Sequence, residues 1–150
     1  MLDTRFGIEI GSGRARIAVI DDDAVFLDLM HDLLANGEGY EVVSSSQWFQ
    51  SYEFIRMADP DLVILDLMMG REQTGWGVLQ LLQSDPVTAA IPVILCSAAE
   101  PALRQKAHRL NGQALVEAVP KPFDVDHLVR RGRAPARAAQ PQKDRQLSTL

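Results

Sequence analysis

Five short apolar runs are spaced along the chain, and each predicts a β-strand. They cover residues 17–20, 40–43, 62–65, 93–96 and 115–119. Most of the runs are rich in Val and Ile and show little alternation of apolar and polar residues. This pattern is typical of strands that are buried on both faces of a parallel sheet.

Segments with helical periodicity follow these runs. Apolar residues recur every three or four positions in 24–36, 47–58, 76–84 and 101–110, and in a shorter segment at 124–131. Gly37 and the Asp-Pro pairs at 59–60 and 85–86 mark helix ends. Five strands that alternate with five helices predict a doubly wound α/β fold, with a parallel sheet and right-handed crossovers.

The two ends of the chain fall outside this alternation. Residues 1–14 are mostly polar, and we expect a flexible N-terminal leader. Residues 132–150 have no apolar period and are biased towards Ala, Gln, Arg and Pro, so we expect a disordered tail. The domain predicted between these ends spans residues 15–131.

The charge of the chain is divided unevenly. The net charge is −5, but residues 130–150 carry six basic side chains and one acidic one, which leaves −10 on the remainder. A body this acidic argues against non-specific binding of nucleic acid, whose phosphates attract Lys and Arg.

A single cysteine, Cys96, excludes an intrachain disulfide and a cysteine-rich zinc site. The N-terminus lacks the apolar segment of a signal peptide and no run is long enough for a membrane helix, so we expect a cytoplasmic protein.

The chemically distinctive residues follow the predicted strands directly. Asp21 and Asp22 follow the first strand, Asp66 the third, Ser97 the fourth and Lys121 the fifth. In doubly wound sheets, the residues after the strands converge at one edge near the topological switch point. Crowded carboxylates repel one another, and a hard cation such as Mg²⁺ relieves that repulsion. A magnesium site with a spare carboxylate, a hydroxyl and a lysine suits a phosphoryl group.

These residues resemble the receiver domain of bacterial two-component response regulators over about residues 15–131. The resemblance is carried by the acidic pair 21–22, by the motif Pro60-Asp-Leu-Val-Ile-Leu-Asp66, by Ser97 and by Lys-Pro-Phe at 121–123. It implies a flavodoxin-like fold with strand order 2-1-3-4-5. It also implies a signalling phosphoacceptor, not an enzyme that acts on separate substrates.

The resemblance assigns a role to each matching residue. Asp66 would accept the phosphoryl group from a sensor histidine kinase or a phosphotransfer protein. Asp22, Asp66 and the main-chain carbonyl of Met68 would ligate Mg²⁺, and Asp21 would act largely through water. Ser97 and Lys121 would bind the phosphoryl oxygens. The small residue Ala98 would leave room for the phosphodonor.

The chain departs from the family pattern at two places. The family usually has Pro four residues and Gly eight residues after the phosphoacceptor, where this chain has Gly70 and Thr74, and Gly75 follows one residue late. We therefore expect an insertion in the loop 68–75. The family also favours an aromatic residue three positions before the lysine. That position is Ala118, so the usual aromatic switch cannot operate here.

Two other functions compete with the phosphoacceptor. A silent receiver that only docks other proteins would suit the altered loop and the missing aromatic residue, and it would not bind Mg²⁺. A phosphatase with an aspartate nucleophile would require an acidic residue at the position of Met68.

Asp23 is assigned to the start of helix 24–36 as an N-cap or first-turn acid.

The remaining expectations concern lifetime and partners. Neither Met68 nor Ala99 can orient a hydrolytic water, so we predict slow self-dephosphorylation. A downstream protein would dock on the face of helix 101–110, strand 115–119 and helix 124–131, and a homodimer is possible. The residues after the last helix are too few for a DNA-binding module. We therefore expect a single-domain regulator or a fragment, with no direct DNA binding and no membrane partner.

Overall fold

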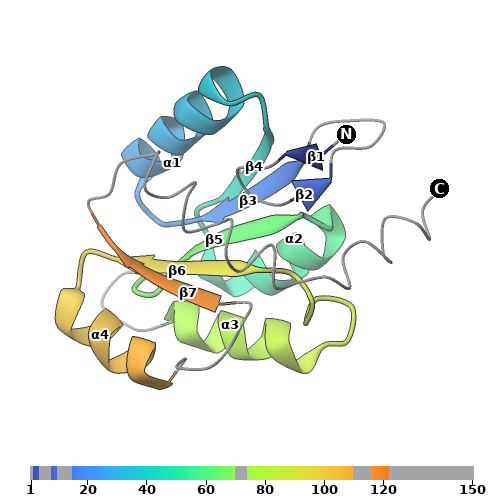
Figure 1. The fold of residues 1–150 in the computed structure, drawn as a ribbon. Helices are drawn as coiled ribbons and strands as arrows, with labels where there is room; N and C mark the ends of the chain where they lie inside the picture. Colours follow the sequence, from blue (N-terminus) through green and yellow to red (C-terminus); the bar gives the residue numbers. More distant parts are fainter. Residues whose placement is uncertain (1, 4–7, 10–14, 70–73, 110–115, 122–150) are drawn as a thin grey trace.

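A parallel sheet of five strands forms the centre of the molecule (Figure 1). The computed structural model of the chain describes residues 2–3, 8–9, 15–69, 74–109 and 116–121. The sheet has the order β4-β3-β5-β6-β7, which confirms the predicted order 2-1-3-4-5 and the flavodoxin-like fold. Its strands are β3 (Arg16–Ile20), β4 (Glu41–Ser45), β5 (Leu62–Asp66), β6 (Val93–Ser97) and β7 (Val116–Pro120).

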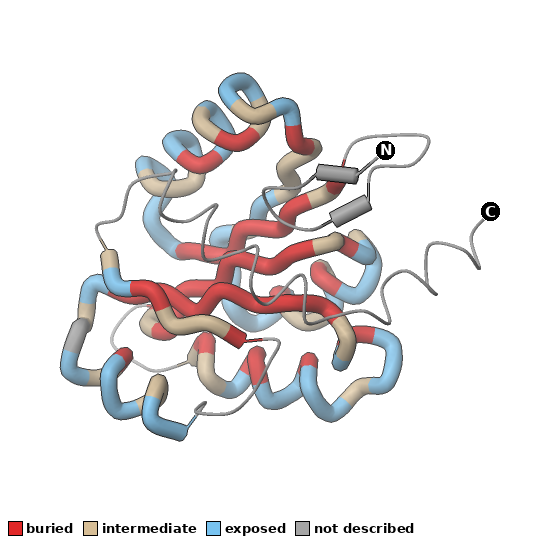
Figure 2. The backbone as a smooth tube through the Cα atoms, in the orientation of Figure 1, coloured by how far each residue is buried: buried red, intermediate tan, exposed pale blue. Residues whose placement is uncertain are grey.

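Helices cover both faces of this sheet (Figures 1 and 2). Helix α1 (Ala24–His31) packs on one face. The opposite face packs against α2 (Ser51–Ala58), α3 (Thr74–Ser84) and α4 (Glu100–Arg109). Successive residues of a strand point to opposite faces of the sheet. Ile17 and Val19 face the α1 side, and Ala18 and Ile20 face the other side. Burial on both faces explains why the strands read as continuous apolar runs.

The helix ends differ in detail from the predicted segments. Helix α1 continues as a wide π-helical turn, η1 (Asp32–Gly37), and a 3₁₀ turn, η2 (Trp48–Gln50), precedes α2. Asp59 ends α2 in the left-handed conformation, with φ of 47°, and its N–H donates to the carbonyl of Ile55 at 3.0 Å. This closure precedes Pro60, at the end that the Asp-Pro signal predicts.

The predicted leader contains one element that the sequence pattern did not indicate. Strands β1 (Leu2–Asp3) and β2 (Ile8–Glu9) pair antiparallel as a separate two-stranded sheet. The predicted helix 124–131 and the predicted disordered tail 132–150 lie outside the described residues.

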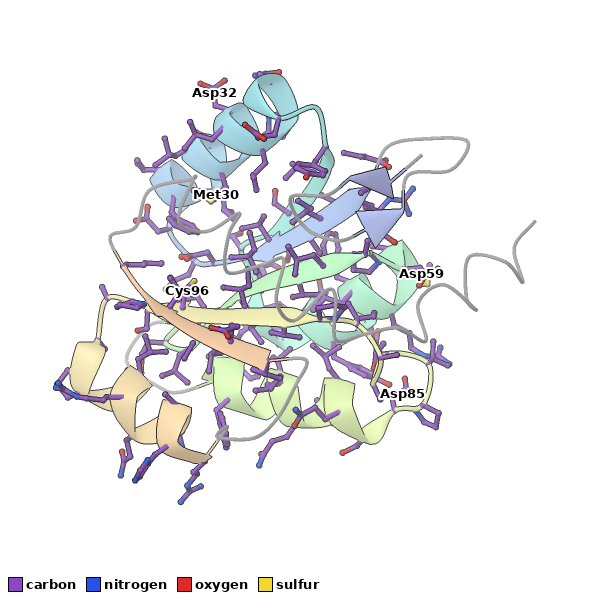
Figure 3. The ribbon with its side chains drawn as sticks, in the orientation of Figure 1. Met30, Asp32, Asp59, Asp85 and Cys96 are labelled. Carbon is purple, nitrogen blue, oxygen red and sulfur yellow. The ribbon has the colours of Figure 1, made fainter. Side chains whose placement is uncertain are left out.

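The core on the α1 side encloses the single cysteine of the chain. Met30 from α1 and Cys96 from β6 belong to one buried cluster between the helix and the sheet (Figure 3). Burial raises the pKa of the Cys96 thiol, so the group remains protonated. This environment agrees with its interpretation as a small buried apolar residue. Among the described residues, no helix is long and apolar enough to cross a membrane.

Candidate functional site

The structure brings three carboxylates together at the ends of two adjacent strands. Asp66 ends β5 and Asp21 directly follows β3, which pairs with β5 through Ile20 and Leu65. One oxygen from each of Asp21, Asp22 and Asp66 lies within 4.8 Å of the others. Asp21 and Asp66 are only 1% and 4% exposed, whereas Asp22 is exposed. The parallel register therefore creates a cluster of three acidic residues, two of which are buried.

Lys121 supplies the positive charge of this cluster. Its Nζ lies 2.5 Å from Oδ2 of Asp21 and 3.8 Å from Oδ2 of Asp66. The backbone N–H of Lys121 donates to the carbonyl of Ser97 at 3.0 Å, which ties the residue to the end of β6. Burial by itself lowers the pKa of Lys121, but the hydrogen bond and charge of Asp21 outweigh burial, so the pKa is raised. The ammonium is therefore fully charged at neutral pH.

One lysine does not compensate the negative charge around Asp66. The pKa of Asp66 is raised to about 7, first by burial and then by the charge of Asp21, and the charge of Lys121 opposes this rise only in part. A carboxylate that is hard to ionise beside two others fits a site for a hard divalent cation. The oxygen ligands of Asp21, Asp22 and Asp66 are the type that Mg²⁺ prefers. The residues present thus fit a magnesium ion.

Ser97 reaches the same edge of the sheet from β6. Cys96 pairs with Asp66, so Ser97 stands one residue beyond the partner of Asp66. The Ser97 hydroxyl is buried and accepts a hydrogen bond from the N–H of Ala99 at 3.0 Å. The N–H of Met68 donates to Oδ1 of Asp66 at 3.3 Å. The role of the Met68 carbonyl as a metal ligand stays a prediction.

Gly75 supports Asp66 from the start of α3. A Cβ at Gly75 would lie 1.9 Å from the carbonyl oxygen of Asp66, so only glycine fits this contact. The N–H of Gly75 also donates to the carbonyl of Leu67 at 3.0 Å. A glycine nine residues after Asp66 therefore packs against the backbone of Asp66. Residues 70–73, which belong to the loop 68–75 where we expect an insertion, lie outside the described part of the chain.

Helix α1 begins at the acidic cluster. Asp23 is its N-cap, because its side chain accepts hydrogen bonds from the N–H groups of Val25 and Phe26, which confirms its predicted role. The Phe26 ring lies under the ammonium of Lys121, with Nζ 4.1 Å from the ring centroid. Phe26 is one of the apolar residues in the predicted helix 24–36. Nothing in the local sequence could reveal a contact with a residue so far along the chain.

The predicted docking face is only partly described. Helix α4 packs on β7, and Ala118 is half-buried within that strand. Helix 124–131, the third part of the predicted face, lies outside the described residues. The homodimer also remains only an expectation from the sequence.

Comparison with known proteins identifies similar regulators. The chain is 34% identical over 121 residues to the DNA-binding dual master transcriptional regulator RpaA of Synechocystis sp., covering 79% of this chain and 48% of RpaA. It is 30% identical to the DNA-binding response regulator MtrA of Mycobacterium tuberculosis, covering 81% and 50%. The chain thus spans about half the length of these curated relatives.

Solved receiver structures share the fold. The N-terminal domain of a response regulator receiver protein from Methanoculleus marisnigri superimposes with a TM-score of 0.61 at 29% identity, covering 77% of this chain and 91% of that one. A CheY-like receiver domain protein from Methanospirillum hungatei has a TM-score of 0.71 at 20% identity, covering 87% and 99%.

These relatives correct one prediction from the sequence. The expectation of no direct DNA binding is wrong, because RpaA and MtrA are both named DNA-binding regulators. The prediction rested on the acidic charge of the body and on the short segment after the last helix. The charge of one part of a regulator does not limit what another part binds.

The family itself follows from the match over most of the chain. A model of the response regulator receiver domain matches residues 17–133, which include all four landmarks quoted from the sequence. Phosphorylation and Mg²⁺ are general features of that family. The chain belongs to the response regulator receiver domain family of two-component signalling.

Proposed function

We propose that the chain is a phosphorylation-controlled switch in which Asp66 accepts the phosphoryl group. The observation that carries this proposal is the surrounding of Asp66. Its buried carboxylate has Asp21 and Asp22 within 4.8 Å and the Lys121 ammonium at 3.8 Å. This combination of a carboxylate nucleophile, a cation site and a lysine suits phosphoryl transfer.

The donor in this proposal is a phosphohistidine of a sensor histidine kinase or a phosphotransfer protein. A carboxylate oxygen of Asp66 attacks the phosphorus atom, a new P–O bond forms, and the P–N bond to the imidazole breaks. The imidazole keeps the electron pair of that bond and takes a proton from solvent. The product is an acyl phosphate on Asp66, and no oxidant or other co-reactant is needed.

Each neighbour of Asp66 has a role in this proposal. Asp21, Asp22, Asp66 and the Met68 carbonyl would hold Mg²⁺, which supplies charge neutralisation at the phosphoryl oxygens. Lys121 is close enough to Asp66 to bind a second phosphoryl oxygen. The Ser97 hydroxyl, which accepts a hydrogen bond from the N–H of Ala99, would donate its own hydrogen bond to a third phosphoryl oxygen.

The output of the switch is proposed from the relatives. RpaA and MtrA are named DNA-binding regulators, so we propose that phosphorylation of this domain controls a DNA-binding activity. Control then requires two conformations of the domain, one of which is stabilised by the phosphoryl group on Asp66. Because residue 118 is Ala, the coupling between Ser97 and the predicted docking face cannot use an aromatic side chain at that position.

Incubation with acetyl phosphate, a small acyl phosphate donor, tests the proposal. With Mg²⁺ present, one phosphoryl group should be added to each chain, as measured by intact-protein mass spectrometry. Removal of Mg²⁺ by a chelator should prevent the addition, and Asp66→Asn should abolish it. Equal labelling of wild type and Asp66→Asn would overturn the assignment of Asp66.

A further inference from the structure

An aromatic ring and two carboxylates enclose the ammonium of Lys121 from different elements. Asp21 and Asp66 approach Nζ from the ends of β3 and β5, at 2.5 and 3.8 Å. The ring of Phe26 approaches from α1, with its centroid 4.1 Å from Nζ. The Lys121 side chain is only 16% exposed, so little water competes with these contacts.

The ring differs from the carboxylates in one respect that matters for function. An aromatic face attracts a cation through its quadrupole, and this attraction strengthens when water is excluded. Asp21 also offers one carboxylate oxygen to the acidic cluster that a cation would use. If Asp21 also binds a metal ion, its attraction for the Lys121 ammonium becomes weaker. The neutral ring of Phe26 does not bind the metal ion, so its attraction for Lys121 is unchanged.

We infer that Phe26 is a positioning residue that holds the Lys121 ammonium at Asp66 by a cation–π contact. The inference rests on the proposed function, because Lys121 must remain near Asp66 to bind the phosphoryl group. Phe26 would act only through Lys121. Its backbone position is fixed by the start of α1, where its N–H donates to the N-cap Asp23 at 3.4 Å.

Phe26 also packs against the buried cluster under α1, so packing and cation–π attraction must be separated. Fluorinated phenylalanines at position 26 achieve this, because fluorine weakens the quadrupole of the ring with little change in its size. We expect the same substitutions to leave the fold and the acidic cluster intact, because the size of the ring hardly changes. Leu27 packs on the same cluster, and Leu27→Met is a matched control for small changes of packing.

The experiment measures the rate of phosphorylation by acetyl phosphate and Mg²⁺ in the full chain. We expect the rate to fall stepwise from Phe to mono-, di- and trifluorophenylalanine, by about threefold to tenfold in total. Leu27→Met should keep the wild-type rate. Equal rates across the series would overturn the inference while leaving the proposed function intact. Absence of labelling on wild-type Asp66 would instead overturn the proposed function.

A second readout does not depend on activity. The methylene protons next to Nζ of Lys121 lie near the Phe26 ring, so their NMR signals should be shifted upfield by the ring current. Phe26→Leu should return these signals to ordinary lysine positions, and Phe26→Tyr should restore the shift. Signals at ordinary positions in the wild type would contradict the contact, whatever the rates.

Discussion

The backbone of Asp66 and the α-carbon of Gly75 are in direct contact, and no side chain fits between them. A Cβ at position 75 would lie 1.9 Å from the Asp66 carbonyl oxygen and 2.9 Å from the α-carbon of Leu67. Both neighbours are backbone atoms, which cannot move aside as a flexible side chain can. Helix α3 is therefore seated directly against the proposed phosphoacceptor.

Gly75→Ala should destabilise the fold and slow phosphorylation of Asp66. We expect the free energy of unfolding to fall by about 2 kcal/mol, because the clash outweighs the better helix propensity of Ala. Urea denaturation measures this change. Gly77→Ala is the matched control in the same helix, since nothing lies within 4 Å of its added Cβ. It should be neutral or stabilising by up to about 1 kcal/mol; equal effects at both positions would contradict the described contact.

Asp66→Asn should stabilise the metal-free protein at alkaline pH. The pKa of Asp66 is raised from 3.8 to about 7, so the folded state binds a proton more tightly than the unfolded state. The resulting penalty is absent below about pH 4, grows as the pH rises towards 7, and is constant above it. We expect Asp66→Asn to raise the free energy of unfolding by roughly 2–4 kcal/mol at pH 8 and little at pH 4. Urea denaturation at both pH values, with a chelator present, measures this difference. An effect of Asp66→Asn that is the same at pH 4 and pH 8 would contradict the raised pKa as its cause.

Magnesium binding should release protons near neutral pH. Asp66 is about half protonated at pH 7, and a bound cation favours its carboxylate form, so roughly half a proton should leave per ion. Calorimetric titration in two buffers of different ionisation enthalpy measures this number, which should approach zero at pH 9. Asp22→Asn should weaken binding, because Asp22 belongs to the oxygen cluster. Failure of Mg²⁺ to bind the wild type would favour a silent docking module.

The acyl phosphate on Asp66 should be long-lived. Met68 lies two residues after Asp66 and Ala99 two after Ser97, and neither side chain can orient a water by hydrogen bonding. We expect Met68→Asn to shorten the half-life of the phosphorylated form, with Met68→Leu as the apolar control. Loss of phosphate within seconds in the wild type would contradict this expectation.

The sheet and the acidic cluster were predictable because both follow from short-range patterns. Buried parallel strands produce continuous apolar runs, and their carboxyl ends meet at one edge, so the convergence of Asp21 and Asp66 could be inferred. The contact between Phe26 and Lys121 could not, since it depends on how α1 settles on the sheet. The π-helical turn at 32–37 has no signature in the apolar spacing. The prediction of no DNA binding was wrong because the charge pattern covers only the given sequence, which spans about half the length of RpaA and MtrA.

Location of the phosphoryl group tests the central claim most directly. After labelling with acetyl phosphate and Mg²⁺, the protein is digested, and the modified residue is found by tandem mass spectrometry under conditions that preserve acyl phosphates. The account predicts a single phosphoryl group on the Asp66 carboxylate and none in Asp66→Asn. A phosphoryl group on Ser97 or a histidine, or an unmodified wild type that binds Mg²⁺, would contradict it.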